Sequence, residues 1–130
     1  MRIVPGRPED GRSAPWTEHL TGAAWMDLLM QEDPGSDAAV TLTSVTFAPG
    51  GRSHWHRHDA GQLLVIVSGE GWVGDREEGP HLVRTGDLVW TGPDEDHWHG
   101  ATNDSLLTHL AVTLGGTHWY DEPVDLDDAT

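Results

Sequence analysis

The chain has 130 residues, no cysteine and a formal net charge of −15 at pH 7. A domain of this size can bury a sufficient core without disulfides, and the lack of cysteine excludes thiolate nucleophiles and zinc-finger sites. Every basic residue is an arginine, which excludes Schiff-base chemistry on a lysine, and the negative charge argues against nucleic acid and membrane-surface partners. We therefore expect a small-molecule substrate.

Residues 1–15 contain three prolines and two glycines, without an apolar run that could form a signal peptide or a membrane span. We predict a loose N-terminal arm and a cytoplasmic protein. Residues 16–30 carry apolar side chains at both helical and alternating spacings, so their periodicity does not decide between a helix and a strand. The composition of residues 32–37 is typical of a turn.

The β-rich run 39–47 alternates between two faces, as a half-buried strand does. The side chains expected on one face are Thr41, Thr43, Val45 and Phe47.

The stretch 50–71 combines several possible metal ligands and is predicted to form a strand, a turn and a second strand. Alternate side chains of a strand share a face, so His54, His56 and His58 should point to one side. After the turn, Gln62 brings an amide oxygen back beside these imidazoles at the start of a buried apolar strand. Imidazole nitrogen and amide oxygen suit divalent manganese, iron, cobalt, nickel or zinc. The stretch therefore predicts a metal site.

Beyond residue 71, short β-type runs recur between turns that contain glycine or proline. These runs are 72–73, 81–84, 88–91, 97–101 and 106–114. Evenly spaced short strands predict an all-β sandwich or barrel. No repeat or linker divides the chain, so we expect one domain at 16–124 and an acidic, solvated tail at 125–130 to which we assign no chemistry.

The spacing of glycines and histidines in 50–69 resembles the first conserved motif of the cupin family, with Gln62 where most cupins carry glutamate. Residues 86–97 resemble the second motif, which ends at His97. The resemblance implies a double-stranded β-helix, also called a jelly-roll barrel. The metal ligands that it implies are His56, His58, Gln62 and His97.

The cofactor implied by these ligands is one divalent transition metal, with manganese or iron expected first and nickel, cobalt or zinc as alternatives. Three neutral imidazoles and a neutral amide leave the ion its full charge. The metal should therefore be a stronger Lewis acid than in a cupin that binds it through glutamate.

A second set of histidines is predicted to face the barrel interior. His99 shares a strand face with His97, and His109 lies in an otherwise apolar strand. Over roughly residues 16–124 the chain is similar to small bacterial cupins that include manganese-dependent hydroxynitrile lyases and carboxymuconolactone-decarboxylase-like cupins. This similarity implies that His99 and His109 lie in the pocket, where an imidazole can act as acid or base. His54 is a further candidate near the metal or in the pocket.

The remaining histidines are expected to be exposed: His19, His81 and His118. The chain departs from the similar lyases just before His97, where Asp94 and Asp96 stand at positions that commonly hold a glycine and a lysine. This turn is therefore expected to differ in shape and charge.

The pocket walls expected from strand parity and family positions are Thr43, Val45, Ser53, Leu64, Ile66, Leu107, Ala111 and Thr113. Such walls suit a small, largely apolar substrate with one polar end. Four of the seven tryptophans are expected to serve packing rather than substrate binding. They are Trp55, Trp72, Trp90 and Trp98.

Three hypotheses of function follow. The first is a lyase that cleaves or forms a C–C bond next to an oxygen-bearing carbon, with the metal as Lewis acid and a pocket histidine as acid or base. The second is an Fe(II)-dependent dioxygenase, and the third is a non-catalytic metal- or ligand-binding cupin. Open sheet edges and the high tryptophan content also predict a homodimer or homotetramer.

Overall fold

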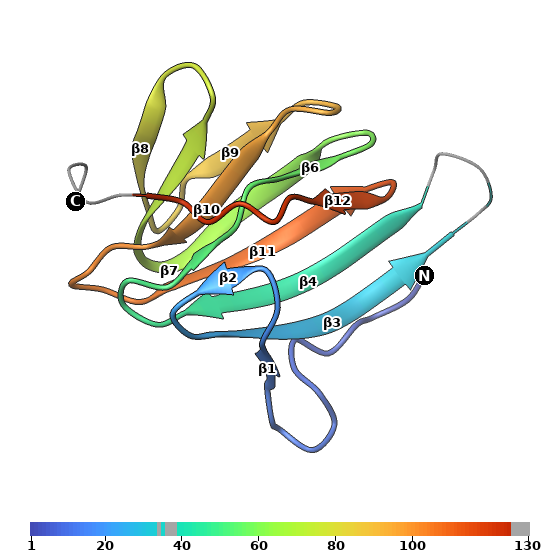
Figure 1. Cartoon of the computed structure of the whole chain (residues 1–130). Helices are drawn as coiled ribbons and strands as arrows, with labels where there is room; N and C mark the ends of the chain where they lie inside the picture. The colour runs from blue at the N-terminus through green and yellow to red at the C-terminus, as the bar shows by residue number, and fades with distance from the viewer. Residues whose placement is uncertain (34, 36–38, 126–130) are drawn as a thin grey trace.

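The computed structural model describes residues 1–33, 35 and 39–125. These residues form strands and contain no helix, which confirms the all-β prediction (Figure 1). The strands are β1 (Ala14–Trp16), β2 (Leu20–Thr21), β3 (Ala24–Glu32), β4 (Val40–Phe47), β5 (Arg52–Ser53), β6 (His56–His58), β7 (Gln62–Asp75), β8 (Gly79–Arg84), β9 (Leu88–Thr91), β10 (His97–Ala101), β11 (Leu107–Leu114) and β12 (Thr117–Trp119). In this described part, no helix could cross a membrane.

The longest strand, β7, takes part in both walls of the barrel. Its first half pairs with β9 and β11, and its second half pairs with β8 and β10. The change occurs near Gly69, which has a φ of 86° and lies so close to the carbonyl of Leu106 that a Cβ atom would not fit. A glycine at this position therefore lets one strand serve two sheets.

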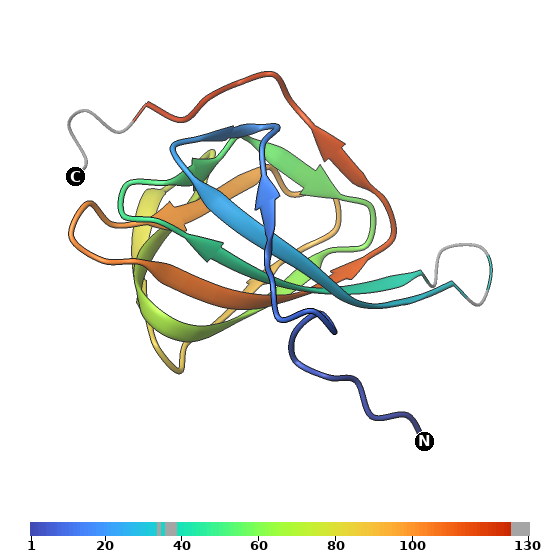
Figure 2. The ribbon, with the colours of Figure 1, turned by 90° about the horizontal axis from the view of Figure 1, so that it is seen from below.

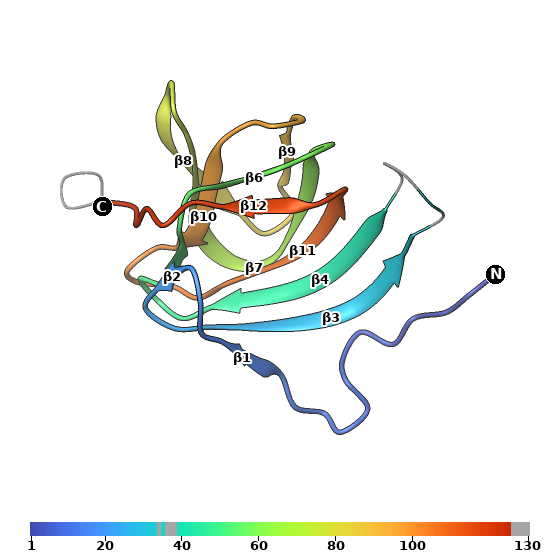
Figure 3. The ribbon, with the colours of Figure 1, turned by 45° about the vertical axis from the view of Figure 1, so that its right-hand side comes forward.

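The strands wrap around one interior, as the view along the barrel shows (Figure 2). The antiparallel order β1-β3-β4-β11-β7 forms one wall. Strands β8, β10, β6 and β12 belong to the opposite wall, where β6 lies between β10 and β12 (Figure 3). This double-sheet arrangement is the predicted jelly roll.

The core lies in the barrel interior. Phe47 of β4 and Leu107 of β11 are fully buried opposite each other, and Leu64 and Ile66 of β7 join them. Burial of each of these side chains contributes about 2 kcal/mol to stability. The predicted inward face of β4 is correct, since Val45 and Phe47 are buried and Thr41 and Thr43 are half-buried on the same side.

The segment 16–30, which periodicity left undecided, forms strands. β3 pairs with β4 over its whole length, and β1 extends this wall by pairing with the first residues of β3. Residues 34, 36 and 37 of the predicted turn, the following residue 38, and residues 126–130 of the predicted tail lie outside the described residues. The domain boundaries proposed from the sequence stay a prediction.

The tryptophans divide between packing and the surface. Trp98 is buried and packs with Trp55, Trp72 and Val124, as predicted for a packing role. Trp90, by contrast, is 57% exposed beside the exposed Leu88 on β9. Such apolar exposure is compatible with the predicted homo-oligomer, which stays a prediction.

Candidate metal centre

The predicted ligands come from three strands that meet at one end of the barrel. His56 pairs directly with His97 in the register of β6 and β10, while His58 lies two residues along β6 and Gln62 begins β7. All four side chains are buried. The ring centroids of His56 and His97 are 4.3 Å apart, and that of His58 is 5.1 Å from each. The structure therefore brings the predicted ligand set together.

The Nδ1 atoms of these histidines are engaged on the outer side of the cluster. His56 Nδ1 lies 2.9 Å from the carbonyl of His54, and His97 Nδ1 lies 3.0 Å from the carbonyl of Glu95. A carbonyl can only accept, so each Nδ1 carries the proton and each Nε2 carries a lone pair. His58 Nδ1 lies 2.9 Å from the hydroxyl of Thr117. Its Nε2 is buried without a hydrogen-bond partner among the described residues.

Gln62 completes the group with an oxygen. Its Nε2 donates to the hydroxyl of Thr113 at 2.9 Å, which turns Oε1 toward His97. Gln62 Oε1 and His97 Nε2 are 3.2 Å apart. Both atoms are acceptors in this tautomer, so their lone pairs repel unless a cation lies between them. The unpartnered Nε2 of His58 and the facing lone pairs of Gln62 and His97 fit a divalent metal. Neutral nitrogen and oxygen donors suit manganese, iron and the other divalent transition metals.

A further nitrogen lies within reach of the same ion. One ring nitrogen each from His56, His97 and His99 lie within 4.8 Å of one another. The sequence had assigned His99 to the pocket rather than to the metal. The structure thus supports a three-histidine site for a divalent metal, and places Gln62 and His58 beside it.

Burial keeps the candidate ligands neutral. Loss of solvation lowers the pKa of His97, and it lowers the pKa of His56 still further with the help of the neighbouring His97. Burial followed by the charge of His97 lowers the pKa of His58 to about 4. Only a neutral imidazole binds a metal, so these rings can bind a cation at neutral pH without first losing a proton.

The two predicted catalytic histidines form a hydrogen-bonded pair. His109 Nε2 and His99 Nδ1 are 3.0 Å apart, and both side chains are buried. Phe47 packs against both rings, with centroids 5.7 and 5.9 Å away. Burial is the main cause that lowers the pKa of His109 to about 4 and that of His99 well below its usual value. The ring of His99 lies 5.1 Å from that of His56, so the pair adjoins the ligand cluster.

The predicted wall residues lie in the interior, all of them buried except the half-buried Thr43. A cavity of about 320 Å³ opens between β7, β8, β9 and β10 and reaches His97. Leu64 is the one predicted wall residue that lines it. The sequence analysis missed Val73, Val83, Val89, Thr91 and Glu95, which also line it. Trp90, which was assigned to packing rather than to the pocket, lines the same cavity. The apolar runs that carry the three valines had been identified, but their pairing across β7 had not.

The other histidines lie outside the cluster. A bend at residues 54–55 separates β5 from β6, so the expected alternation does not extend back to His54. His54 is half-buried and contributes its carbonyl to His56. His81 and His118 are exposed, as predicted, whereas the half-buried His19 stacks on Trp119 with ring centroids 5.0 Å apart. The prediction that His19 is exposed is therefore wrong.

A family model described as the cupin domain matches residues 43–113, which is more than half of the chain. The chain belongs to the cupin family. Among similar proteins, the (R)-mandelonitrile lyase of Granulicella tundricola is 45% identical to this cupin over 95 residues, which cover 72% of this chain and 70% of the relative. The family resemblance read from the two motifs is thereby confirmed.

Solved structures agree. A cupin-like protein from Thermotoga maritima superposes with a TM-score of 0.78 and 30% identity, over 85% of this cupin and 86% of that protein. The polyketide cyclase RemF from Streptomyces resistomycificus gives a TM-score of 0.61 at 18% identity, over 72% of this chain and 66% of that protein. The second likeness concerns the fold alone.

Replacement of His97 by alanine should weaken metal binding by about a hundredfold or more, because it removes one of the buried nitrogens that would bind the ion. Titration of the metal-free protein with Mn(II) measures the effect. Asp104→Ala, at an exposed position between β10 and β11, serves as the control and should bind like the wild type. Full metal occupancy in His97→Ala would contradict the assignment.

The metal-free protein should lose stability as the pH falls from 8 to 5. His58 and His109 have a folded-state pKa of about 4, below the ordinary value of 6.5, so the unfolded chain takes up protons in this range that the native state does not. Each group should lower the free energy of unfolding by roughly 2 kcal/mol over this interval. Urea denaturation in the presence of a chelator measures it, and a flat profile would contradict the neutral, buried state of these rings.

Proposed function

We propose that this cupin is a metal-dependent lyase that cleaves or forms a C–C bond next to an oxygen-bearing carbon, in the manner of a hydroxynitrile lyase. The observation that carries the proposal is the buried His99–His109 pair beside the ligand cluster. A binding protein needs ligands only, whereas this pair adds a group that can move a proton. The 45% identity to a protein named (R)-mandelonitrile lyase supports the same reaction type.

In this proposal the bound metal serves as a Lewis acid. A divalent ion held by His56, His58, Gln62 and His97 would supply a Lewis acid for a hydroxyl or carbonyl oxygen of the substrate. The chain keeps the imidazole and amide groups of these ligands neutral. Thr113 holds the amide of Gln62 in place, and burial prevents protonation of the imidazoles.

Proton transfer is assigned to His99. Its Nε2 is buried without a hydrogen-bond partner among the described residues, while its Nδ1 bonds His109. In the tautomer in which His99 Nδ1–H donates to His109 Nε2, the Nε2 of His99 presents a lone pair and can take a proton from a substrate hydroxyl. His109 holds the ring of His99 in this orientation.

The cavity restricts the substrate. Its volume of about 320 Å³ and its leucine and valine walls suit a small ligand that is mainly apolar. Asp75 and Glu95 also line it, so an anionic substrate would be repelled at neutral pH. We therefore propose a neutral molecule that carries one hydroxyl or carbonyl group.

The test is cleavage of small neutral hydroxynitriles by the protein loaded with Mn(II) or Fe(II), measured as release of aldehyde and cyanide. We expect metal-dependent cleavage, and His99→Ala should keep its metal but lose on the order of a hundredfold or more in rate. Loss of the metal from this variant would identify His99 as a ligand and contradict its role as the base. Substrate-dependent oxygen uptake with Fe(II) would favour a dioxygenase, and no turnover with either metal would favour a binding protein.

Gln62→Glu should separate metal affinity from activity. A carboxylate binds a dication better than an amide does, so metal affinity should be retained or increased. The added negative charge should lower the Lewis acidity of the ion and reduce turnover by roughly tenfold or more. Metal dissociation constants and rates measured on the same preparation check both points. Undiminished turnover would contradict the role of the neutral amide.

A further inference from the structure

A short segment near the C-terminus passes along the outer side of the candidate ligands. We call residues 117–122, which comprise β12 and the three residues after it, the C-terminal clamp. In the register of β12 and β6, Thr117 lies opposite His58 and Trp119 opposite His56. The pairing continues beyond β12, because Trp55 exchanges backbone hydrogen bonds with Tyr120 and Glu122 at 3.0 and 3.1 Å. The clamp therefore runs antiparallel beside β6, the strand that carries His56 and His58 (Figure 3).

Two clamp residues contact candidate ligands directly. The hydroxyl of Thr117 lies 2.9 Å from Nδ1 of His58. The ring of Trp119 packs on the ring of His56, with centroids 4.3 Å apart. The Thr117 contact is made to Nδ1 of His58 and the Trp119 contact is made to the ring of His56, so both can fix ring orientation and leave the Nε2 atoms for a metal.

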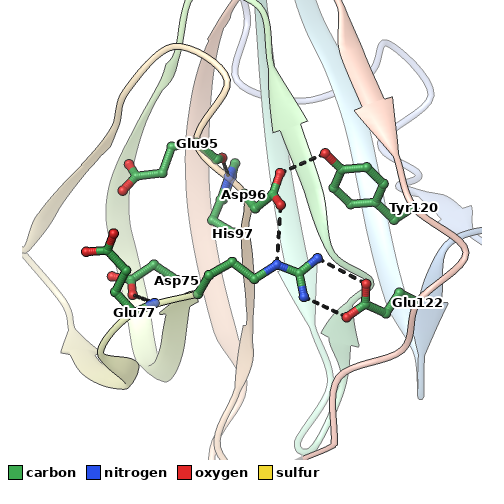
Figure 4. Close-up of polar contacts among 8 residues, drawn as sticks. Asp75, Glu77, Glu95, Asp96, His97, Tyr120 and Glu122 are labelled. Carbon is green, nitrogen blue, oxygen red and sulfur yellow. Dashed lines mark hydrogen bonds and ion pairs between the residues drawn. The ribbon is translucent and has the colours of Figure 1, made fainter.

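A third clamp residue acts on the turn before His97. The hydroxyl of Tyr120 donates to Asp96 at 2.7 Å, and this bond raises the pKa of the phenol, which stays protonated at neutral pH. Asp96 lies between His97 and Glu95, whose carbonyl holds Nδ1 of His97. Asp96, Tyr120 and Glu122 lie near one another beside His97 (Figure 4). The clamp thus reaches all three histidines of the proposed ligand set.

Arg76 ties the clamp to the barrel. Its guanidinium forms two hydrogen bonds with Glu122, at 2.7 and 3.0 Å, and one with Asp96 at 3.3 Å. The same group lies over the ring of Trp55, 3.9 Å from its centroid. Asp96 and Glu122 would repel each other without a cation between them, which matters in a chain of net charge −15.

The turn that presents Arg76 is itself fixed. The carboxylate of Asp75 accepts the backbone N–H groups of Glu77 and Glu78 at 2.9 and 2.7 Å. Arg76 is therefore held at the tip of the β7–β8 hairpin in a position to bridge the two carboxylates. The clamp lies beyond residue 113, where the match to the cupin domain ends.

We propose that the C-terminal clamp positions the metal-binding histidines and that Arg76 keeps it in place. Thr117 and Trp119 are positioning residues, because they act through His58 and His56 rather than on the metal. In the tautomer in which His58 Nδ1–H donates to Thr117, the lone pair of His58 is on Nε2, where it can bind a metal. The inference rests on the metal site proposed above.

The first test is the affinity of the metal-free protein for Mn(II), measured by titration. Thr117→Val should weaken binding about tenfold, since it removes the partner that orients His58. Thr117→Ser keeps the hydroxyl and should restore the affinity of the wild type. The matched control is Thr108→Val, which removes a 2.9 Å hydroxyl contact to Thr46 on another part of the barrel and should leave affinity unchanged.

The second test concerns Arg76. Arg76→Met should weaken Mn(II) binding about fivefold, because Glu122 of the clamp loses its ion pair and faces Asp96 without a cation between them, while the bond from Tyr120 to Asp96 remains. Arg84→Met is the control: Arg84 lies at the far end of β8, where it forms an exposed ion pair with Glu70 at 3.4 Å. With Co(II) as a probe, the visible absorption spectrum should change in Thr117→Val and Arg76→Met but not in the controls.

These measurements separate the two proposals. If the wild type binds neither Mn(II) nor Co(II), the metal site itself is overturned. If the wild type binds both ions, and Thr117→Val and Arg76→Met match it in affinity and spectrum, the metal site stands and the clamp is overturned. Equal weakening by Thr117→Ser and Thr117→Val would also overturn it, because the effect would then not depend on the hydroxyl.

Discussion

The structure depends on the burial of several imidazole rings whose lone pairs converge on one point. Loss of solvation forbids their protonation, and the opposed acceptors of Gln62 and His97 repel each other in the absence of a cation. Such an arrangement stores unfavourable energy in the metal-free chain. A bound cation would remove this penalty, so the same geometry that destabilises the empty barrel favours a metal.

The barrel orients these rings through a hydrogen-bond partner for the Nδ1 atom of each. Backbone carbonyls serve His56 and His97, and a side-chain hydroxyl serves His58. The carbonyls come from residues two positions earlier on the chain, so those two bonds are local. The bond to His58 spans 59 residues and depends on the β12–β6 pairing. Orientation of this ring is therefore a property of the fold rather than of the motif.

The sequence predicted what local spacing determines. Alternation and turn residues located most strands, and the spacing of His56, His58, Gln62 and His97 identified residues that the fold gathers. It did not predict that His99 approaches His56 as closely as it does, because strand parity gives a face but no distance. Nor did composition indicate the contacts at the end of the domain, where Glu122 bonds Arg76 and Val124 is buried. An acidic residue that pairs across 46 positions cannot be recognised from its neighbours.

The continuity of β7 has a consequence for how the molecule opens. Gln62 begins this strand and Arg76 follows its last residue, so one continuous strand joins the amide at the metal site to the arginine that holds the clamp. Separation of β7 from β11 would release the half that begins at Gln62, and the strand itself links this half to the one that pairs with β10 and leads to Arg76. Amide hydrogens along β7 should accordingly exchange as one cooperative unit rather than as two independent halves. Fluctuations that admit solvent to the histidines are thus coupled to those that free the C-terminus.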